Sequence, residues 1–264
     1  MATPNRANTI VKAAARRALE GTGFRPDKTG RTWYEDNGWY VSGIDFQPII
    51  GRPGSFLNVW AHFFWTPAGW ADDPDEYVAG CDYGGRIGDN RNLEGTTIEY
   101  EGDDDLFRQQ ADRLAQRGLA EGEKLRAFRD WTQAKQLLFS YRHMSDSLWG
   151  NWHRAMLCLV TSHPWAREYL ERLSQFEHQF NEPLTRYARN QATTFLALIH
   201  DLPAAQARIA ATIADNRPRF DAQVGPVLAP DYELVFPDPD PADQVPFPAP
   251  EQPKGWRRLF GRQR

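Results

Sequence analysis

The sequence predicts an α+β fold: an N-terminal helix plus an antiparallel sheet of four or five strands, followed by a bundle of antiparallel helices and a disordered Pro-rich C-terminal tail. Residues 23–65 combine turn residues with runs rich in aromatic and β-branched residues, which is typical of hairpin strands. After residue 102 the apolar residues recur at helical spacing instead. The predicted units are 1–102, an α/β sheet domain, 103–220, a helical region packed on it, and 221–264, a Pro-rich acidic linker ending in a basic amphipathic tail.

The composition narrows the classes of function. A hydrophobic fraction of 41% in 264 residues is enough for a packed core. The formal charge of -4 gives no general attraction to nucleic acid, so no nucleic-acid partner is predicted. Cys81 and Cys158 suggest neither a disulfide framework nor a zinc motif, and reduced thiols favour a cytoplasmic protein. No apolar run approaches the roughly 20 residues that span a bilayer, and no secretory signal is recognisable.

The first segment, residues 1–21, has two interpretations. It contains arginines, almost no acids and an amphipathic pattern, which is also how a mitochondrial transit peptide looks. A helix of the domain explains it better, because Thr3 can cap the helix, Pro4 suits its first position, and Gly21 ends it. We therefore interpret the segment as the first helix.

A hairpin follows this helix. Residues 31–35 and 39–47 are rich in aromatic and β-branched residues, and residues 36–38 between them tolerate positive φ. Pro48 removes a ladder donor, so it is expected to end the second strand.

Three further strands are predicted after the hairpin. Residues 55–65 are apolar on both faces, which is typical of a central strand. Residues 77–83 and 96–101 are shorter candidates, separated by a Gly-rich loop at 84–90. This loop resembles a phosphate cradle superficially, but it lacks the Lys-Ser/Thr pair of a P-loop, so a connection between strands is the interpretation.

The helical half begins with Asp103, Asp104 and Asp105, whose charges suit the positive end of a helix dipole. Polar residues before X-Pro pairs then suggest consecutive antiparallel helices with short connections. The predicted breaks are at Gly118, Ser145–Asp146, Ser162, Asn181 and Asp201.

The chain contains no recognisable catalytic signature. Its six histidines form neither an HExxH motif nor a close cluster, so no metal site and no cofactor is predicted. His143, Ser145 and Asp146 are the residue types of a triad, but a helix cap explains Ser145 and Asp146 more economically. The sequence leans against an enzyme without deciding the question.

Aromatic residues are unusually dense in and after the predicted sheet. An excess beyond what a core needs would form a ligand groove or a protein interface, where Trp, Tyr and Arg are favoured. The residues predicted to line this surface are Arg31, Trp33, Tyr34, Asp45, Gln47, Trp60 and His62.

The end of the chain carries a second candidate surface. Residues 226–253 contain no basic residue, whereas residues 254–264 are basic and include apolar residues at helical spacing. Three interpretations stay open: a solvated end, a weak peripheral membrane contact through 254–264, or a protein partner. The predicted contact residues are Trp256, Arg257, Arg258, Leu259 and Phe260.

Residues 9–65 also carry a family likeness, in the order and spacing of short motifs. These motifs are Gly23-Phe24, the run from Lys28 to Tyr34, Asn37-Gly38, the run from Ile44 to Gln47, and the run from Leu57 to Val59. The pattern resembles the domain-of-unknown-function family numbered 4304. It departs from that pattern at Pro48, where a charged residue often stands. The resemblance implies a small α/β domain without an established activity, in a bacterial intracellular protein.

The favoured function is therefore a non-enzymatic binding or adaptor protein, which uses an aromatic sheet surface and a C-terminal basic peptide to contact a protein partner. The alternative is a hydrolase or transferase, whose site is assembled near the sheet from residues distant in sequence. The oligomeric state is not readable from the sequence.

Overall fold

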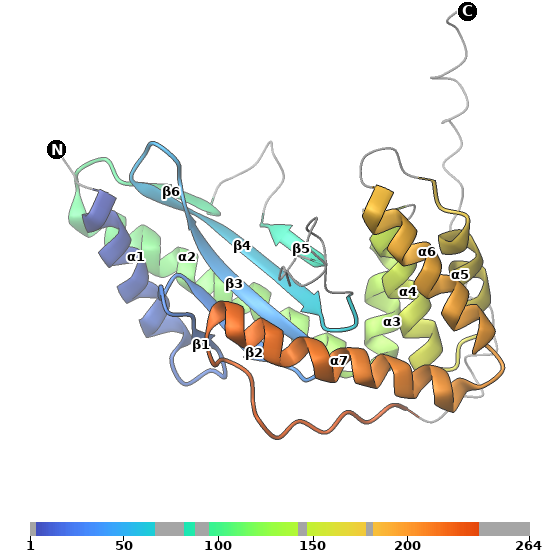
Figure 1. Cartoon of the computed structure of the whole chain (residues 1–264). Helices are drawn as coiled ribbons and strands as arrows, with labels where there is room; N and C mark the ends of the chain where they lie inside the picture. Colours follow the sequence, from blue (N-terminus) through green and yellow to red (C-terminus); the bar gives the residue numbers. More distant parts are fainter. Residues whose placement is uncertain (1–3, 67–81, 88–94, 142–146, 178–181, 238–264) are drawn as a thin grey trace, which may run out of the picture.

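The computed structural model describes residues 4–66, 82–87, 95–141, 147–177 and 182–237. It confirms the α+β fold class: a helix and an antiparallel sheet come first, and helices follow (Figure 1). The predicted cap at Ser145–Asp146 and the predicted tail contacts at 254–264 lie outside the described residues.

Within the described residues, the sheet has six antiparallel strands in the order β1-β2-β3-β4-β5, with β6 also paired to β4. The strands are β1 (Arg25–Pro26), β2 (Thr32–Asp36), β3 (Tyr40–Pro48), β4 (Gly54–Phe63), β5 (Tyr83–Arg86) and β6 (Thr97–Glu99). The sequence did not predict β1. Pro48 ends β3, as expected.

The prediction of a loop at 84–90 is wrong at its start, because β5 runs through Gly84, Gly85 and Arg86 and pairs with β4. A Cβ at Gly84 would lie 2.4 Å from the carbonyl oxygen of Val59, and its φ is +93°. Gly84 therefore lets the backbones of β4 and β5 approach closely, so a glycine can be required inside a strand as well as in a loop.

The helices are α1 (Pro4–Leu19), α2 (Asp104–Lys124), the 3-10 turn η1 (Leu125–Arg129), α3 (Trp131–Ser140), α4 (Leu148–Val160), α5 (Ala166–Ser174), α6 (Glu182–Ala197) and α7 (Leu202–Val224). The predicted first helix and the predicted cap at Asp201 are confirmed, since the Asp201 carboxylate accepts from the Ala204 N–H. The sequence did not predict the helix interruption at η1, after which Asp130 caps α3.

The predicted break at Gly118 is wrong, because Gly118 is buried inside α2. A Cβ there would lie 3.0 Å from Ile44 and 3.2 Å from Leu57 on the sheet. The glycine therefore lets α2 pack closely on the strands, and this contact outweighs the cost of roughly 1 kcal/mol that glycine carries in a helix.

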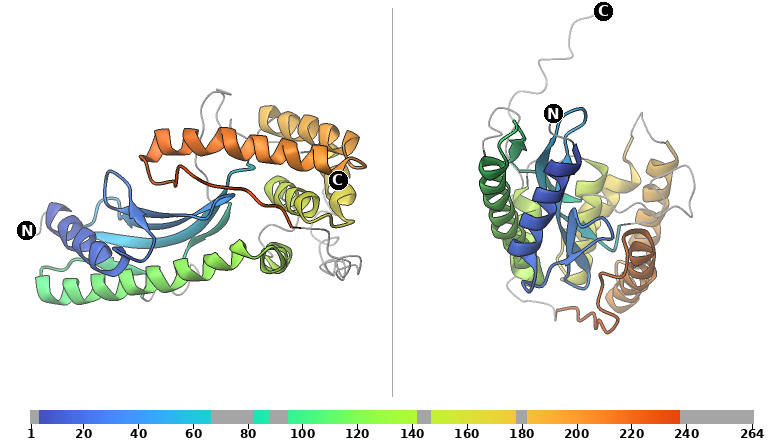
Figure 2. Two further views of the ribbon diagram at one scale, coloured as in Figure 1. Left: turned by 90° about the horizontal axis from the view of Figure 1, so that it is seen from below. Right: turned by 90° about the vertical axis from the view of Figure 1, so that its left-hand side faces the viewer.

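The sheet lies between two helical layers (Figure 2). Helices α1 and α2 cover one face, and α7 crosses the other, with α3 to α6 beside the sheet (Figures 1 and 2). The face toward α1 and α2 is mainly apolar, and Tyr40, Ile44 and Phe46 on β3 are at most 1% exposed. The described sheet and helices share one continuous hydrophobic core.

The end of β4 is the point where the helical half is attached. The Asn216 side chain on α7 donates to the carbonyls of Phe64 and Thr66, both at 2.8 Å. Trp152 on α4 donates its Nε1–H to the carbonyl of Trp65 at 3.2 Å. After α7, the chain continues as an extended strap, residues 225–237, in which Val227 and Leu228 are buried against the protein.

Candidate functional site

The face of the sheet opposite α1 and α2 carries the candidate site. Strand register places Thr32, Asp45, Asn58 and Arg86 in one row across four strands. The neighbouring row contains Tyr34, Gly43, Trp60 and Gly84. Helix α7 covers one end of this face, where Phe220 packs edge-on against Tyr34 and stacks on His62. Away from that end, a set of side chains is half-buried or exposed, and we call it the open strip: Thr32, Asp45, Gln47, Phe56, Asn58, Trp60 and Arg86.

Trp60 forms the aromatic part of the open strip. Its ring lies over Gly43, since a Cβ at Gly43 would come within 2.4 Å of the indole. Tyr34 packs edge-on against the ring, with 5.8 Å between centroids. The absence of a side chain at Gly43 thus lets a half-buried tryptophan lie against the strands and present an aromatic surface.

The polar part of the open strip is already hydrogen-bonded. The Asn58 amide donates to Asp45 Oδ2 at 2.9 Å and to Gln47 Oε1 at 3.1 Å. The Thr32 hydroxyl donates to Asp45 Oδ1 at 3.3 Å, and burial raises the pKa of the Asp45 carboxyl. Because these groups hold one another, their positions are fixed before any ligand arrives.

Arg86 supplies the positive charge of the open strip. Its guanidinium lies 3.9 Å from the centroid of Phe56 and donates to Gln47 Oε1 at 3.3 Å. Arg86 is exposed to solvent. Arginine and tryptophan, which the open strip combines, are both enriched at the centres of protein interfaces.

Arg31 and Trp33, which were predicted to join this surface, lie on the other side of the sheet. The Arg31 Nε–H donates to Asn8 Oδ1 on α1 at 2.7 Å, and Nη1 donates to Ser55 Oγ at 3.2 Å. Burial lowers the pKa of its guanidinium. The side chain therefore fixes α1 to the sheet. Trp33 is 3% exposed, beneath α1.

His62 points the same way as Trp60 but belongs to a buried polar cluster under α7. Its Nδ1 lies 2.8 Å from Asp82 Oδ2, and His153 Nε2 on α4 lies 3.5 Å from Asp82 Oδ1. These three side chains are at most 1% exposed. Asp82 Oδ2 also accepts from the Phe63 N–H at 2.7 Å and from the Thr66 hydroxyl at 2.9 Å.

The proton positions in this cluster follow from its partners. Trp65 Nε1–H can only donate, and it lies 3.1 Å from His153 Nδ1, so this nitrogen is an acceptor and the His153 proton is on Nε2, toward Asp82. Burial alone would raise the pKa of the Asp82 carboxyl. The two imidazoles and their hydrogen bonds outweigh burial and hold the pKa well below its ordinary value.

Sequence reasoning missed Asp82 and His153 as partners of His62. Their positions follow no spacing rule, because β4, the residue before β5, and α4 meet only in the folded chain. The cluster contains acid–base groups but has no access for a bulky substrate in this conformation. The contacts of this cluster therefore support a structural role, in which it joins the sheet to α4, better than they support a reaction site.

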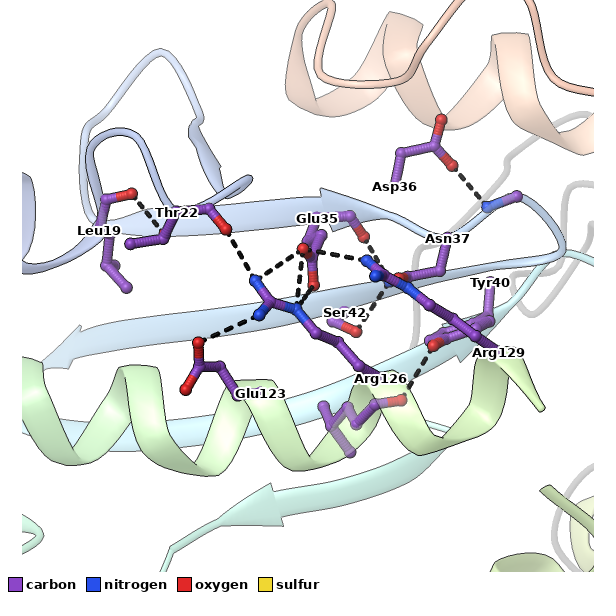
Figure 3. Close-up of polar contacts among 12 residues, drawn as sticks. Leu19, Thr22, Glu35, Asp36, Asn37, Tyr40, Ser42, Glu123, Arg126 and Arg129 are labelled. Carbon is purple, nitrogen blue, oxygen red and sulfur yellow. Dashed lines mark hydrogen bonds and ion pairs between the residues drawn. The ribbon is translucent and has the colours of Figure 1, made fainter. Parts of the chain in front are cut away.

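A second buried carboxylate lies at the hairpin end of the sheet (Figure 3). Glu35 is 5% exposed and receives Arg126 Nε on both carboxylate oxygens, at 3.1 and 3.0 Å. Arg126 also donates to the carbonyl of Thr22 at 2.7 Å, and Arg129 Nη2 lies 3.1 Å from Glu35. The arginines thus fasten the end of α2 and η1 to β2, which is a structural role.

The chain was compared with known proteins at three levels, and no family model, curated protein or solved structure matches it. The likeness of residues 9–65 to the family numbered 4304 stays a prediction. Among the described residues, no helix has the length and apolar character needed to cross a membrane. Within the same ranges, no three His, Cys, Asp or Glu side chains are arranged to hold a metal ion.

Proposed function

We propose that this chain is a non-enzymatic binding or adaptor protein of the bacterial cytoplasm, and that the open strip holds a protein partner. The observation that supports the proposal is the presence of half-buried Trp60 and exposed Arg86 on one sheet face whose polar groups are already fixed. Tryptophan and arginine provide most of the binding energy in many interfaces, and fixed polar groups lower the entropy lost on association.

The chemistry of the strip describes the partner. Asp45 and Gln47 present oxygens, and Arg86 presents guanidinium N–H groups, so a partner surface with both donors and carboxylates is complementary. Trp60 and Phe56 add an apolar centre. This mixture favours a protein surface over a purely apolar ligand.

Site-specific photo-crosslinking in cells tests the proposal. A photo-reactive amino acid at position 47 in the open strip is expected to give a discrete covalent adduct with one partner. The same amino acid at position 113, where exposed Arg113 lies on α2, is the matched control and should give none. Trp60→Ala should remove the adduct at position 47. Equal adducts from the two positions, or an adduct that persists with Trp60→Ala, would contradict the proposal.

We also propose that residues 254–264 contact a second partner. Their apolar residues at helical spacing and their cations support this, although they lie outside the described residues. Deleting 254–264 is expected to remove one set of proteins from a tagged pull-down while leaving the adduct at position 47 intact. Unchanged partners, together with unchanged membrane fractionation, would count against a binding role for the tail.

A hydrolase or transferase remains the second candidate, favoured by the meeting of His62, Asp82 and His153 from three distant parts of the chain. Turnover of an ester or phosphoester by the wild-type chain, lost in Asp82→Asn and kept in Trp60→Ala, would replace the binding proposal with this one.

A further inference from the structure

A groove of about 630 Å³ lies on the α1 side of the sheet, apart from the open strip. It is bounded by the second half of α1 and by the turn between β1 and β2, and Trp33 contributes to its wall. Its volume falls within the range of roughly 300–1,000 Å³ that is typical of small-molecule sites. The charged residues that line it are Lys12, Arg16, Arg17, Lys28, Glu20 and Asp27.

The positive charges of this groove are incompletely neutralised. Arg17 pairs with Asp112 on α2 at 2.6 Å. Within the described residues, Lys12, Arg16 and Lys28 form no ion pair. The smaller hollow on the other flank of α1 differs, because its Arg6, Arg17 and Arg108 each pair with an aspartate of α2. Unneutralised charge is therefore concentrated in the larger groove.

The two acids that line the groove offset only part of this charge. The Asp27 carboxylate is occupied within its own turn, where it accepts from the N–H groups of Thr29 and Gly30 at 3.1 and 2.8 Å. Glu20 is exposed at the end of α1. The cations in the last turn of α1 also suit the negative end of the helix dipole, but Lys12 and Lys28 lie outside that turn and have no such explanation.

Trp33, which lines the same groove, carries a donor without an acceptor in the described part of the chain. The indole Nε1 of Trp33 is buried and has no hydrogen-bond partner among the described residues. A buried donor left unpaired is costly, so an acceptor supplied by a ligand that reaches the indole would be favourable there.

We infer that this groove binds a small polyanion that carries phosphate groups. Arg16 offers a planar fork of N–H donors that matches a phosphate, and Lys12 and Lys28 add point charges from the helix and the turn. The groove is larger than a single phosphate needs, so the ligand class is an oligophosphate or a phosphorylated small molecule. The net charge of -4 for the chain makes this local excess of cations the more distinctive.

The test uses inorganic triphosphate, titrated into the full chain by isothermal calorimetry at low ionic strength. One saturable site is expected, with an affinity that falls as salt is added. The double variant Lys12→Gln/Lys28→Gln should bind about tenfold more weakly or worse, because two charged contacts with the phosphate groups are lost. The exposed Arg219 on α7 provides the matched control, and Arg219→Gln should bind as the wild type does.

Two arms make the result decisive. Citrate, a polyanion with carboxylates, should bind more weakly than triphosphate, and equal binding would overturn the phosphate assignment. Absence of a saturable site, or equal binding by the double variant and the wild type, would overturn the site itself. Circular dichroism verifies that the double variant is folded, and the single Lys28→Gln variant, in an exposed turn, gives the same readout if it is not.

Discussion

Replacing Asp82 with asparagine is expected to lower the free energy of unfolding by about 3–5 kcal/mol at neutral pH. The carboxylate receives His62, His153, the Phe63 N–H and the Thr66 hydroxyl in a site that is 1% exposed. An amide of the same shape has one acceptor oxygen where the carboxylate has two, so buried donors lose their partner. Urea unfolding followed by far-UV circular dichroism measures the loss.

The same variant should change the response to acid. The pKa of Asp82 is lowered in the folded protein, so its contribution is present above the unfolded value of about 4 and is lost as the pH falls below it. Wild-type stability should therefore decline more steeply on acidification than that of Asp82→Asn. Asp112→Asn, at a half-exposed surface pair with Arg17, is the matched control and should cost at most about 1 kcal/mol. Parallel acid profiles for wild type and Asp82→Asn would show that the cluster does not act as described.

Arg217→Met is expected to cost a similar amount, about 3–5 kcal/mol, because Arg217 joins α7, the hairpin and the strap. Its guanidinium donates to both oxygens of Asp36, at 2.8 and 2.7 Å, and to the carbonyls of Gly38 and Ala229 at 2.6 and 3.0 Å. The side chains of Arg217 and Asp36 are each 11% exposed. Methionine would leave the carboxylate buried without its cation, and urea unfolding measures the result.

A double variant distinguishes this network from simple loss of packing. Asp36→Asn together with Arg217→Met should lower the free energy of unfolding by less than the sum of the two single changes. Arg217→Met alone leaves the Asp36 charge buried without a cation, and Asp36→Asn removes that charge. Arg219→Met, at an exposed position on the same helix, should change stability by no more than about 0.5 kcal/mol. Strict additivity of Asp36→Asn and Arg217→Met would refute the coupling.

The order of elements could be predicted from the sequence because strands and helices leave local signals. Glycine was the recurrent source of error. Gly118 looks like a break and Gly84 like a loop, yet each lies within an element that needs a close approach to its neighbour. The sequence shows where a glycine allows unusual backbone angles. Only the tertiary structure shows which neighbouring atom requires the absence of a side chain there.

The candidate site was partly predictable for the same reason. Tyr34, Asp45, Gln47, Trp60 and His62 share a face because side chains alternate along strands and the register matches them across the sheet. Arg31 and Trp33 are also of interface-favoured residue types, but they occupy the alternate positions along the chain, so their side chains lie on the other face. Composition alone does not distinguish the two faces. The partners of His62 could not be predicted, since Asp82 and His153 reach it only through tertiary packing.

The attachment of α7 to the end of β4 has a consequence for how the chain is made. The bond from Asn216 to the carbonyl of Phe64 spans 152 residues, and the bond from the Ala229 N–H to Asp36 spans 193. At a synthesis rate of about 5–20 residues per second, Phe64 is made about 8 seconds or more before Asn216, and Asp36 about 10 seconds or more before Ala229. The apolar end of the sheet stays uncovered during that time, so the nascent chain is exposed to aggregation until α7 has been made.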